Sequence, residues 1–345
     1  RGTMQPLDRT DRRIGIEDVA AAANVSVATV SRALRHLPNV ADSTRERVIG
    51  IAESMGYRPA PAASRLAPGR TRTVTVVVPH LSRWYFSTVI AGAEAVCAEA
   101  GYECVVMSVG SIAGCNRLLG EPSHLERRTD GLVLVNIPAT ETQAESLLQR
   151  GVALSTIGTR TPGHPAVLID DAGAARLATR HLTDLGHRRI GLISGQHDDP
   201  MNFAVPHQRR AGFVAALDDA GVRFEETLVY SGNFGIDGGH EAMGALLDRP
   251  DPPTAVFAMS DEMAFGALMA LSERGLHPAD DVSLIGIDDH DVARVVGLTT
   301  VRQRVASHGA AATRALLSRL ADPSALDTVV ESEIELVVRR TTARP

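Results

Sequence analysis

The chain has 345 residues, a formal net charge of −6 and a hydrophobic fraction of 44%, enough for a small module and one or two core-bearing domains. No run approaches the roughly 18 consecutive apolar residues of a transmembrane helix, and no apolar segment opens the chain, so we expect neither a membrane span nor a secretion signal. Cys97, Cys104 and Cys115 lack CxxC or Cys/His ligand spacing, which argues against disulfides and a zinc site. A reducing cytoplasm fits this composition.

Charge is distributed unevenly along the chain. Residues 1–72 hold 12 of the 35 basic residues and only 7 of the 41 acids, so the remainder is acidic. A basic segment ahead of an acidic body is typical of a nucleic-acid-binding module joined to a domain with another task. Residues 1–13 are predicted to be a disordered or tag-derived tail.

Three short helices are predicted within residues 14–58. Ile16, Val19 and Ala20 begin an apolar helical face, and Asn24 tolerates the left-handed backbone of a tight interhelical turn.

Capping residues define the second and third helices. Ser26 supplies an N-cap oxygen for a helix over residues 27–34. Ser43 and Glu46 then form a capping box for the third helix, and Gly56 stands where a C-terminal cap is wanted. Together the three helices predict a helix-turn-helix domain over residues 14–58.

The second helix of such a domain enters the major groove of DNA. Arg32 is predicted to read a base edge, because a guanidinium can bind the O6 and N7 acceptors of guanine with two hydrogen bonds. Val27 and Ala28 are small enough to touch a thymine methyl or to make room for bases. Solvent exposure of Arg32 and simple packing of the two small residues are the alternatives. Phosphate contacts, which fix register without reading sequence, are predicted for Thr29, Ser31 and Arg45.

Residues 59–72 are predicted to form a hinge helix and linker. A helix beginning here has Pro61 in its first turn and is ended by Pro68 and Gly69. Because it is only about two turns long, and isolated helices of that length are marginal in water, it should fold only against a partner surface.

From Thr73 onward, short apolar runs alternate with segments of helical length. Such runs suit parallel strands covered on both faces, so the fold class is α/β with doubly wound parallel sheets. The interruption at 120–122 predicts that one helix is short or displaced. The predicted strands are 74–78, 104–107, 131–135, 153–157, 190–193, 254–258 and 282–287.

Motifs along nearly the whole chain resemble those of the LacI/GalR family of repressors. In the head they run from Ile16-Glu17-Asp18-Val19-Ala20 through Val25-Ser26-Val27-Ala28-Thr29-Val30-Ser31-Arg32 to Gly56-Tyr57-Arg58-Pro59. Further motifs follow in the family's order at Gly186-His187-Arg188-Arg189-Ile190, Ser260-Asp261-Glu262-Met263-Ala264, Gly286-Ile287-Asp288-Asp289 and Leu298-Thr299-Thr300-Val301-Arg302-Gln303.

The resemblance implies an all-α helix-turn-helix head with a hinge helix, followed by a periplasmic-binding-protein-like effector and dimerisation domain at 73–345. Its two lobes would span about 73–161 with 303–327, and about 162–302 with 328–345. The family's hinge helix inserts an apolar side chain into the minor groove, and the family offset assigns this wedge to Leu66; packing on its own protein is the alternative. Ala60 and Pro61 depart from the commoner family pattern.

For the effector cleft, the resemblance points to Arg209 and Asp288 as a pair that holds ligand hydroxyls or polar edges by charge-assisted hydrogen bonds. A lone Arg or Asp is more often structural, and aromatic residues more often belong to a core. Where Ser260 and Gly158 stand, family members often have Asn and Asp, so no particular ligand carries over. Further effector-binding candidates are Tyr85, Phe86, Ser260 and Gln303, with Trp84 and Phe234 as flat faces for a sugar ring.

The sequence thus predicts a cytoplasmic, homodimeric transcriptional repressor that binds a palindromic operator in double-stranded DNA and responds to a small molecule, expected to be a carbohydrate. The alternative is a periplasmic-type solute-binding receptor without regulatory function, which the basic head and the missing secretion signal disfavour. An enzyme is not expected, because no nucleophile elbow, P-loop or metal cluster is present and no cofactor is indicated. The histidines without ligand spacing are His181, His187, His197 and His207.

Overall fold

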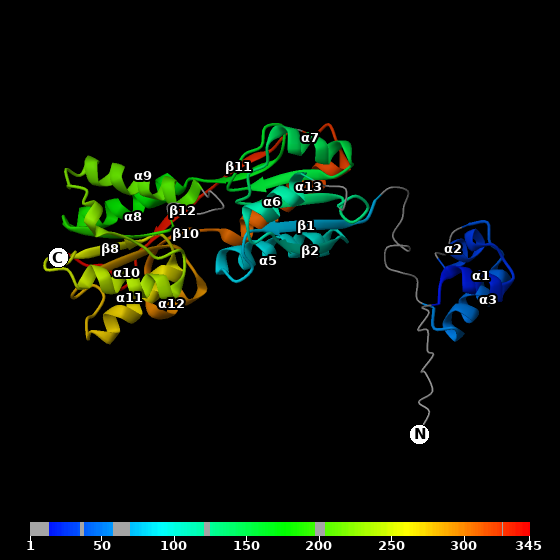
Figure 1. The fold of residues 1–345 in the computed structure, drawn as a ribbon, viewed down its shortest axis with the longest axis horizontal. Helices are drawn as coiled ribbons and strands as arrows, with labels where there is room; N and C mark the ends of the chain where they lie inside the picture. Colours follow the sequence, from blue (N-terminus) through cyan, green and yellow to red (C-terminus); the bar gives the residue numbers. More distant parts are fainter. Residues whose placement is uncertain (1–13, 35–37, 58–69, 121–124, 197–203, 326) are drawn as a thin grey trace, which may run out of the picture. The chain divides into compact units, whose positions relative to one another are not determined.

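The computed structural model describes residues 14–34, 38–57, 70–120, 125–196, 204–325 and 327–345 (Figure 1). The chain divides into two compact units, Arg1–Thr71 and Arg72–Pro345. Predictions that concern residues 1–13 and most of the hinge, Leu66 included, lie outside the described residues.

The smaller unit is a three-helix module. Its helices are α1 (Ile16–Ala23), α2 (Val27–Leu34) and α3 (Asp42–Ser54). Val19, Val30 and Val48, one from each helix, are fully buried and form its core. Asn24 ends α1 with a left-handed φ of 52°, and the Ser26 hydroxyl accepts the Thr29 backbone N–H at 3.1 Å. Both predicted helix boundaries at this turn are therefore confirmed.

The predicted capping box of the third helix is wrong. Helix α3 begins at Asp42, with Ala41 as an N-cap that makes no side-chain cap, so Ser43 already lies inside the first turn. Asp42 places a carboxylate in that turn, where the helix dipole favours negative charge. At the other end Gly56 adopts a left-handed φ of 66°, as the predicted C-terminal cap requires.

The larger unit contains two six-stranded sheets. The first has the order β11-β5-β4-β3-β1-β2 and is parallel throughout; the second has the order β12-β10-β9-β8-β6-β7, with only β12 antiparallel to its neighbour. Their strands are β1 (Thr73–Val78), β2 (Glu103–Ser108), β3 (Gly131–Val135), β4 (Ala153–Ile157), β5 (Ala166–Ile169), β6 (Ile190–Ser194), β7 (Val229–Ser231), β8 (Ala255–Ala258), β9 (Ser283–Asp288), β10 (Thr299–Gln303), β11 (Val329–Ser332) and β12 (Ile334–Val337).

Helices cover both faces of each sheet, so the predicted doubly wound α/β class is confirmed (Figure 1). All seven predicted strands are present, and strands β1, β3, β4, β8 and β9 are buried along their whole length. The helices are α5 (Trp84–Glu99), α6 (Ile112–Gly120), α7 (Glu141–Gln149), α8 (Asp171–Leu185), α9 (Ala204–Asp219), α10 (Ile236–Leu247), α11 (Asp261–Glu273), α12 (Asp291–Val296) and α13 (Val305–Ala321), with a short 3-10 helix, η2 (Glu226–Leu228). Helix α6 ends at Gly120, where the interruption was predicted.

The lobe boundaries differ from those expected. Strands β5 and β11 both belong to the first sheet, where they pair with each other in parallel through Ala166 and Val329. The first lobe therefore extends to Ile169, and the chain returns to it before crossing to the second lobe between Ser332 and Ile334. The boundary was misplaced because β5 has only four residues and does not stand out in the sequence as a strand. In the structure it pairs with β4 in the first sheet.

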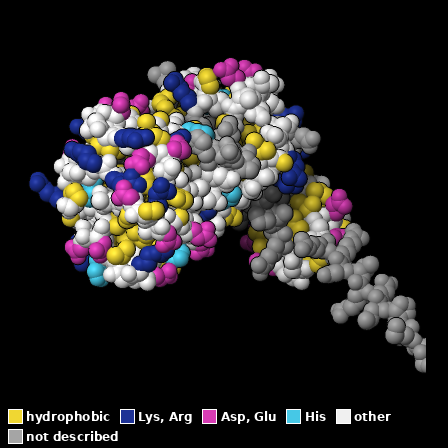
Figure 2. All heavy atoms as spheres, turned by 60° about the vertical axis from the view of Figure 1, so that its left-hand side comes forward, with side chains coloured by type: hydrophobic (Ala, Val, Ile, Leu, Met, Phe, Trp, Pro, Cys, Tyr) yellow, Lys and Arg dark blue, Asp and Glu magenta, His cyan; other side chains and the backbone are white. Residues whose placement is uncertain are grey.

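The larger unit has a mixed surface. On the face shown in Figure 2, arginine and acidic side chains are interspersed rather than gathered by sign. That pattern gives no electrostatic footprint for nucleic acid on this face of the unit. Within the described ranges, no helix combines the length and apolar character that crossing a bilayer would require.

Close packing of α5 on α13 should make Gly92 intolerant of a side chain. A Cβ at Gly92 would lie 1.9 Å from the carbonyl oxygen of Ala306, a backbone atom that cannot move without shifting the helix. We expect Gly92→Ala to lower the free energy of unfolding by about 1–3 kcal/mol, the usual cost of overpacking. Gly120→Ala at the end of α6 is the matched control, because nothing lies within 4 Å of its Cβ position. Equal urea midpoints for the two variants would contradict this close-packing argument.

Candidate functional site

The carboxyl ends of strands from both sheets meet at a cleft in the larger unit, the place where open α/β sheets bind ligands. Its space measures about 790 Å³, including the opening to solvent. Among the residues predicted from the sequence, those lining the cleft are Tyr85, Phe86, Arg209, Phe234, Ser260, Asp288 and Gln303. The cleft therefore gathers seven of the predicted residues from six separate segments of the chain, although their role in effector binding stays a prediction.

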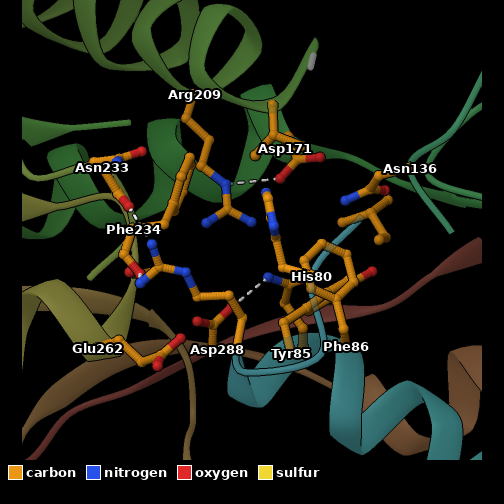
Figure 3. Close-up of a pocket in the computed structure, with 15 residues that line it drawn as sticks. His80, Tyr85, Phe86, Asn136, Asp171, Arg209, Asn233, Phe234, Glu262 and Asp288 are labelled. Atoms are coloured by element: carbon orange, nitrogen blue, oxygen red, sulfur yellow. Dashed lines mark hydrogen bonds and ion pairs between the residues drawn. The ribbon is translucent and has the colours of Figure 1, made fainter. Parts of the chain in front are cut away.

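Arg209 is held by a buried ion pair at one wall of the cleft (Figure 3). Its Nε donates to Asp171 Oδ1 at 2.7 Å, and a terminal nitrogen donates to the carbonyl of Met259. The two charged side chains are only 6% and 4% exposed. Burial raises the pKa of Asp171, although the nearby guanidinium opposes that shift. Much of the hydrogen-bonding capacity of Arg209 is thus already used within the protein.

Asp288 lies at the end of β9 and is 6% exposed. It accepts a hydrogen bond from Gln303 Nε2 at 2.9 Å and another from the backbone N–H of Asp261. Burial raises the pKa of Asp288 to about 7; Arg209 opposes this shift and Glu262 adds to it. The cleft therefore contains a carboxyl group whose pKa is raised to near neutral pH by burial.

Backbone strain gathers around the cleft. Asn136, Asn233, Phe234 and Asp288 all have positive φ angles, of 54°, 46°, 51° and 133°, and all four line the cleft. Non-glycine residues rarely adopt such angles, and they persist only where the surrounding structure enforces them. Strain of this kind is typical of a ligand site, which is an independent reason to place function here.

Asn136 occupies the space left by the absent side chain of Gly158. A Cβ at Gly158 would lie 1.9 Å from Asn136 Oδ1, so an Asp at that position could not coexist with Asn136 as it stands. Asn136 also lines the cleft. Its side-chain amide therefore forms part of the cleft wall beside Gly158, the position where family members often have an Asp carboxylate.

The first turn of α5 in the first lobe is bonded to the second lobe. The Arg83 guanidinium donates to the carbonyls of Phe234 at 2.6 Å and Asn233 at 2.9 Å, and the backbone N–H of Trp84 donates to the Glu262 carboxylate. These contacts connect the lobes beside the cleft.

Trp84 is turned away from the cleft. Its ring stacks on His290 with centroids 4.6 Å apart, and Phe265 meets the same imidazole edge-on with centroids 5.1 Å apart. Of the two predicted stacking faces, only Phe234 lines the cleft, so Trp84 is a contact between lobes rather than a wall of the site.

Ser260 has a structural partner at the cleft. Its hydroxyl caps α11 by accepting the Met263 backbone N–H at 3.3 Å. Tyr85 differs, because its hydroxyl oxygen is buried without a hydrogen-bond partner, and burial raises the pKa of this phenol. A ligand or water could therefore satisfy Tyr85.

Several cleft residues were missed by the sequence analysis. A usable signal was present: Asn136 directly follows β3, and Asp171 lies two residues beyond β5, so both stand at the carboxyl end of a parallel strand. The missed polar lining residues are His80, Arg83, Asn136, Asp171, Asn233 and Glu262.

In the smaller unit, α2 presents an outward face. Val27 is 42% exposed, and Ala28 and Arg32 are also exposed, whereas Val30 and Ala33 are buried.

The predicted phosphate-contacting side chains lie partly within the module. The Thr29 hydroxyl is bonded to that of Ser26 at 2.9 Å, Arg45 donates to the carbonyl of Val40 at 3.3 Å, and Ser31 is half-buried.

Two family models match the chain where the two units lie. Residues 15–60 match the model of bacterial regulatory proteins of the lacI family, and residues 179–342 match a periplasmic binding protein-like domain. A lacI-type three-helix module joined to a periplasmic binding protein-like domain defines a transcriptional regulator of the lacI type.

Curated relatives match over nearly their whole length. Catabolite control protein A of Priestia megaterium is 32% identical over 95% of this chain and 99% of its own. The HTH-type transcriptional repressor CytR of Escherichia coli K12 is 33% identical over 95% of this chain and 96% of its own. The chain belongs to the lacI family of bacterial regulatory proteins, and it is a DNA-binding transcriptional regulator rather than an enzyme.

Solved structures agree with this assignment. The lac repressor dimer bound to operator and the anti-inducer ONPF superposes with a TM-score of 0.75 at 25% identity, covering 96% of this chain and 100% of the other. The complex of the transcriptional regulator CelR with cellobiose has a TM-score of 0.68 at 32% identity, covering 95% and 100%.

The buried carboxyl of Asp288 should make stability depend on pH. Its pKa is raised to about 7 in the folded protein, so the folded state binds this proton more tightly than the unfolded chain does. Stability from this group is present below the unfolded pKa of about 4 and is lost as pH rises to about 7. Relative to wild type, Asp288→Asn should therefore gain unfolding free energy with rising pH, by at most about 1.4 kcal/mol per pH unit. The measurement is the unfolding free energy of both proteins from urea denaturation between pH 5 and 8. A difference between variant and wild type that stays constant over this range would refute the prediction.

Proposed function

We propose that this chain represses transcription as a homodimer bound to a palindromic operator, and that a small polyhydroxylated effector in the cleft controls this binding. The observation that carries the proposal is the pairing, in one chain, of a lacI-type three-helix module with a two-lobed cleft lined by polar strand ends. Because it acts on DNA, we assign its action to the cytoplasm.

The exposed face of α2 supports direct reading of DNA. Arg32, Val27 and Ala28 face solvent while Val30 anchors the helix in the core, so the reading side chains can reach a groove without disturbing the fold. Arg32 would bind a guanine edge, and the two small residues would fit beside a thymine methyl. The relative bound to operator is a dimer, and two-fold symmetry of the protein matches a palindromic site. Leu66 remains our candidate for the minor-groove wedge.

The cleft supports control by a small molecule. Relatives of this fold were solved with cellobiose and, in a regulator from Enterococcus faecium, with ribose. Arg83 and Glu262 line the cleft and also take part in the bonds that connect the lobes. A ligand that contacts them would favour one lobe arrangement over another, which is the thermodynamic requirement for an effector.

A periplasmic-type solute receptor is the competing function. It would share the two-lobed domain but would have no use for residues 15–60, which match the lacI family model. The head therefore favours the regulator.

Arg32 provides the test of the reading face. Selection of bound sequences from a random DNA pool should return a palindrome. Arg32→Ala should weaken binding to it by about 1–3 kcal/mol and relax preference at one position in each half-site. Arg117→Ala on α6 of the larger unit is the control and should bind like wild type. Unchanged affinity together with unchanged base preference in the Arg32 variant would remove this residue from the reading set.

A further inference from the structure

The charged side chains that line the cleft differ in whether they have a partner of opposite charge. Arg209 is already paired with Asp171, both being buried. Arg83 donates to two backbone carbonyls and lies near enough to Glu262 to lower the pKa that burial raises in that carboxyl. These four side chains form two pairs of opposite charge, and among the described residues of the lining Asp288 is the carboxylate left outside both pairs.

Asp288 has hydrogen bonds but no ion pair among the described residues. Its partners are an amide nitrogen of Gln303 and a backbone N–H. Asp261, whose backbone N–H bonds Asp288, is itself fully buried, and its carboxylate accepts the Thr300 hydroxyl at 2.7 Å and the His290 backbone N–H at 2.9 Å. The Arg209 guanidinium lies near enough to favour the ionised form of Asp288, but it is bonded to Asp171, so the charge of Asp288 is only partly compensated. A buried carboxylate in this state is costly, and a positive charge entering the cleft would be stabilised here.

Gln303 adds an independent observation that points to a ligand. Its side chain is 3% exposed and lines the cleft. Because Nε2 donates to Asp288, the amide orientation is fixed and Oε1 is left as an acceptor, and that oxygen is buried without a partner. An unpaired acceptor beside a carboxylate that lacks an ion pair favours a ligand group with more than one N–H or O–H donor.

A protonated amine has this chemistry. It carries three donors and no acceptor, whereas a hydroxyl has a single donor. One ammonium group could therefore donate to Asp288 and Gln303 together while supplying the missing charge. Phe86 and Phe234, which also line the cleft, offer apolar faces to the carbon skeleton.

We infer that the effector is an amine-bearing polyol or sugar derivative whose protonated nitrogen lies between Asp288 and Gln303. This inference rests on the proposed function and narrows its ligand class from neutral carbohydrates to amino compounds.

The test compares matched ligands by isothermal calorimetry on the full chain. Each set contains an amine, its hydroxyl counterpart and its N-acetyl derivative, for example glucosamine, glucose and N-acetylglucosamine, extended to galactose, pentose and linear polyol series. Acetylation keeps the nitrogen but removes the charge. At least one amine should bind, and at least about tenfold more tightly than both neutral members of its set, since a hydrogen bond to a charged group is about twice as strong as a neutral one. The single tryptophan, Trp84, gives a fluorescence readout of the contact between lobes in the same titration.

Variants connect the preference to the assigned residues. Asp288→Asn should weaken the amine about tenfold to a hundredfold and abolish its advantage over the hydroxyl counterpart. Gln303→Met removes the unpaired acceptor and the Nε2–H bond to Asp288 while it keeps the carboxylate itself, and it should weaken the same amine. This variant also provides the test if the Asp288 variant fails to fold. Asp218→Asn on the exposed end of α9 is the matched control and should bind like wild type.

Three outcomes would overturn the inference: no amine binds, a neutral member binds as tightly as its amine, or both cleft variants keep wild-type preference. Binding by a neutral sugar would leave the proposed regulator intact and correct only the ligand class. The proposed function itself is tested separately, by measuring operator binding without any effector. A protein that selects no DNA sequence would show that the proposed function has failed.

Discussion

Burial of parallel strands on both faces is the constraint on which this structure depends. Strands β3 and β8 are buried along their whole length and contain no polar side chain, so the polar residues of these segments stand just beyond the strand ends, where helices no longer cover the backbone. Asn136 follows β3, Ser260 follows β8, and Asp288 ends β9. Because two sheets direct these ends toward each other, polar chemistry from both lobes gathers at a single cleft.

Contacts between the lobes and contacts with a ligand involve the same residues. Arg83 bonds the second lobe through two carbonyls, and Glu262 accepts the Trp84 N–H from the first lobe. Both Arg83 and Glu262 also line the cleft. A ligand there changes the surroundings of the bonds that set lobe spacing, so binding energy and lobe arrangement are coupled without any intermediate chain of residues.

The sequence predicted best what depends on local spacing. The head helices follow from apolar periodicity and from Asn24 and Ser26, and the seven apolar runs all form strands. Long-range pairing was less accessible. Nothing local in Ala166–Ile169 indicates that this strand pairs with β11, more than 150 residues later, and so the lobe boundaries were misplaced. Trp84 likewise resembled a sugar-stacking face, although its partner His290 belongs to the other lobe.

Family position proved a better guide to location than to chemistry. Arg209 and Asp288 line the cleft where the resemblance assigned them, but Arg209 is paired with Asp171, whereas Asp288 makes hydrogen bonds and no ion pair among the described residues. Asn136 fills the space where a Gly158 side chain would stand. A ligand therefore contacts all of these neighbours and not only the pair Arg209 and Asp288. Two regulators can therefore share the same Arg and Asp and still select ligands of different charge, because what each residue offers is decided by which hydrogen bonds the protein has already made.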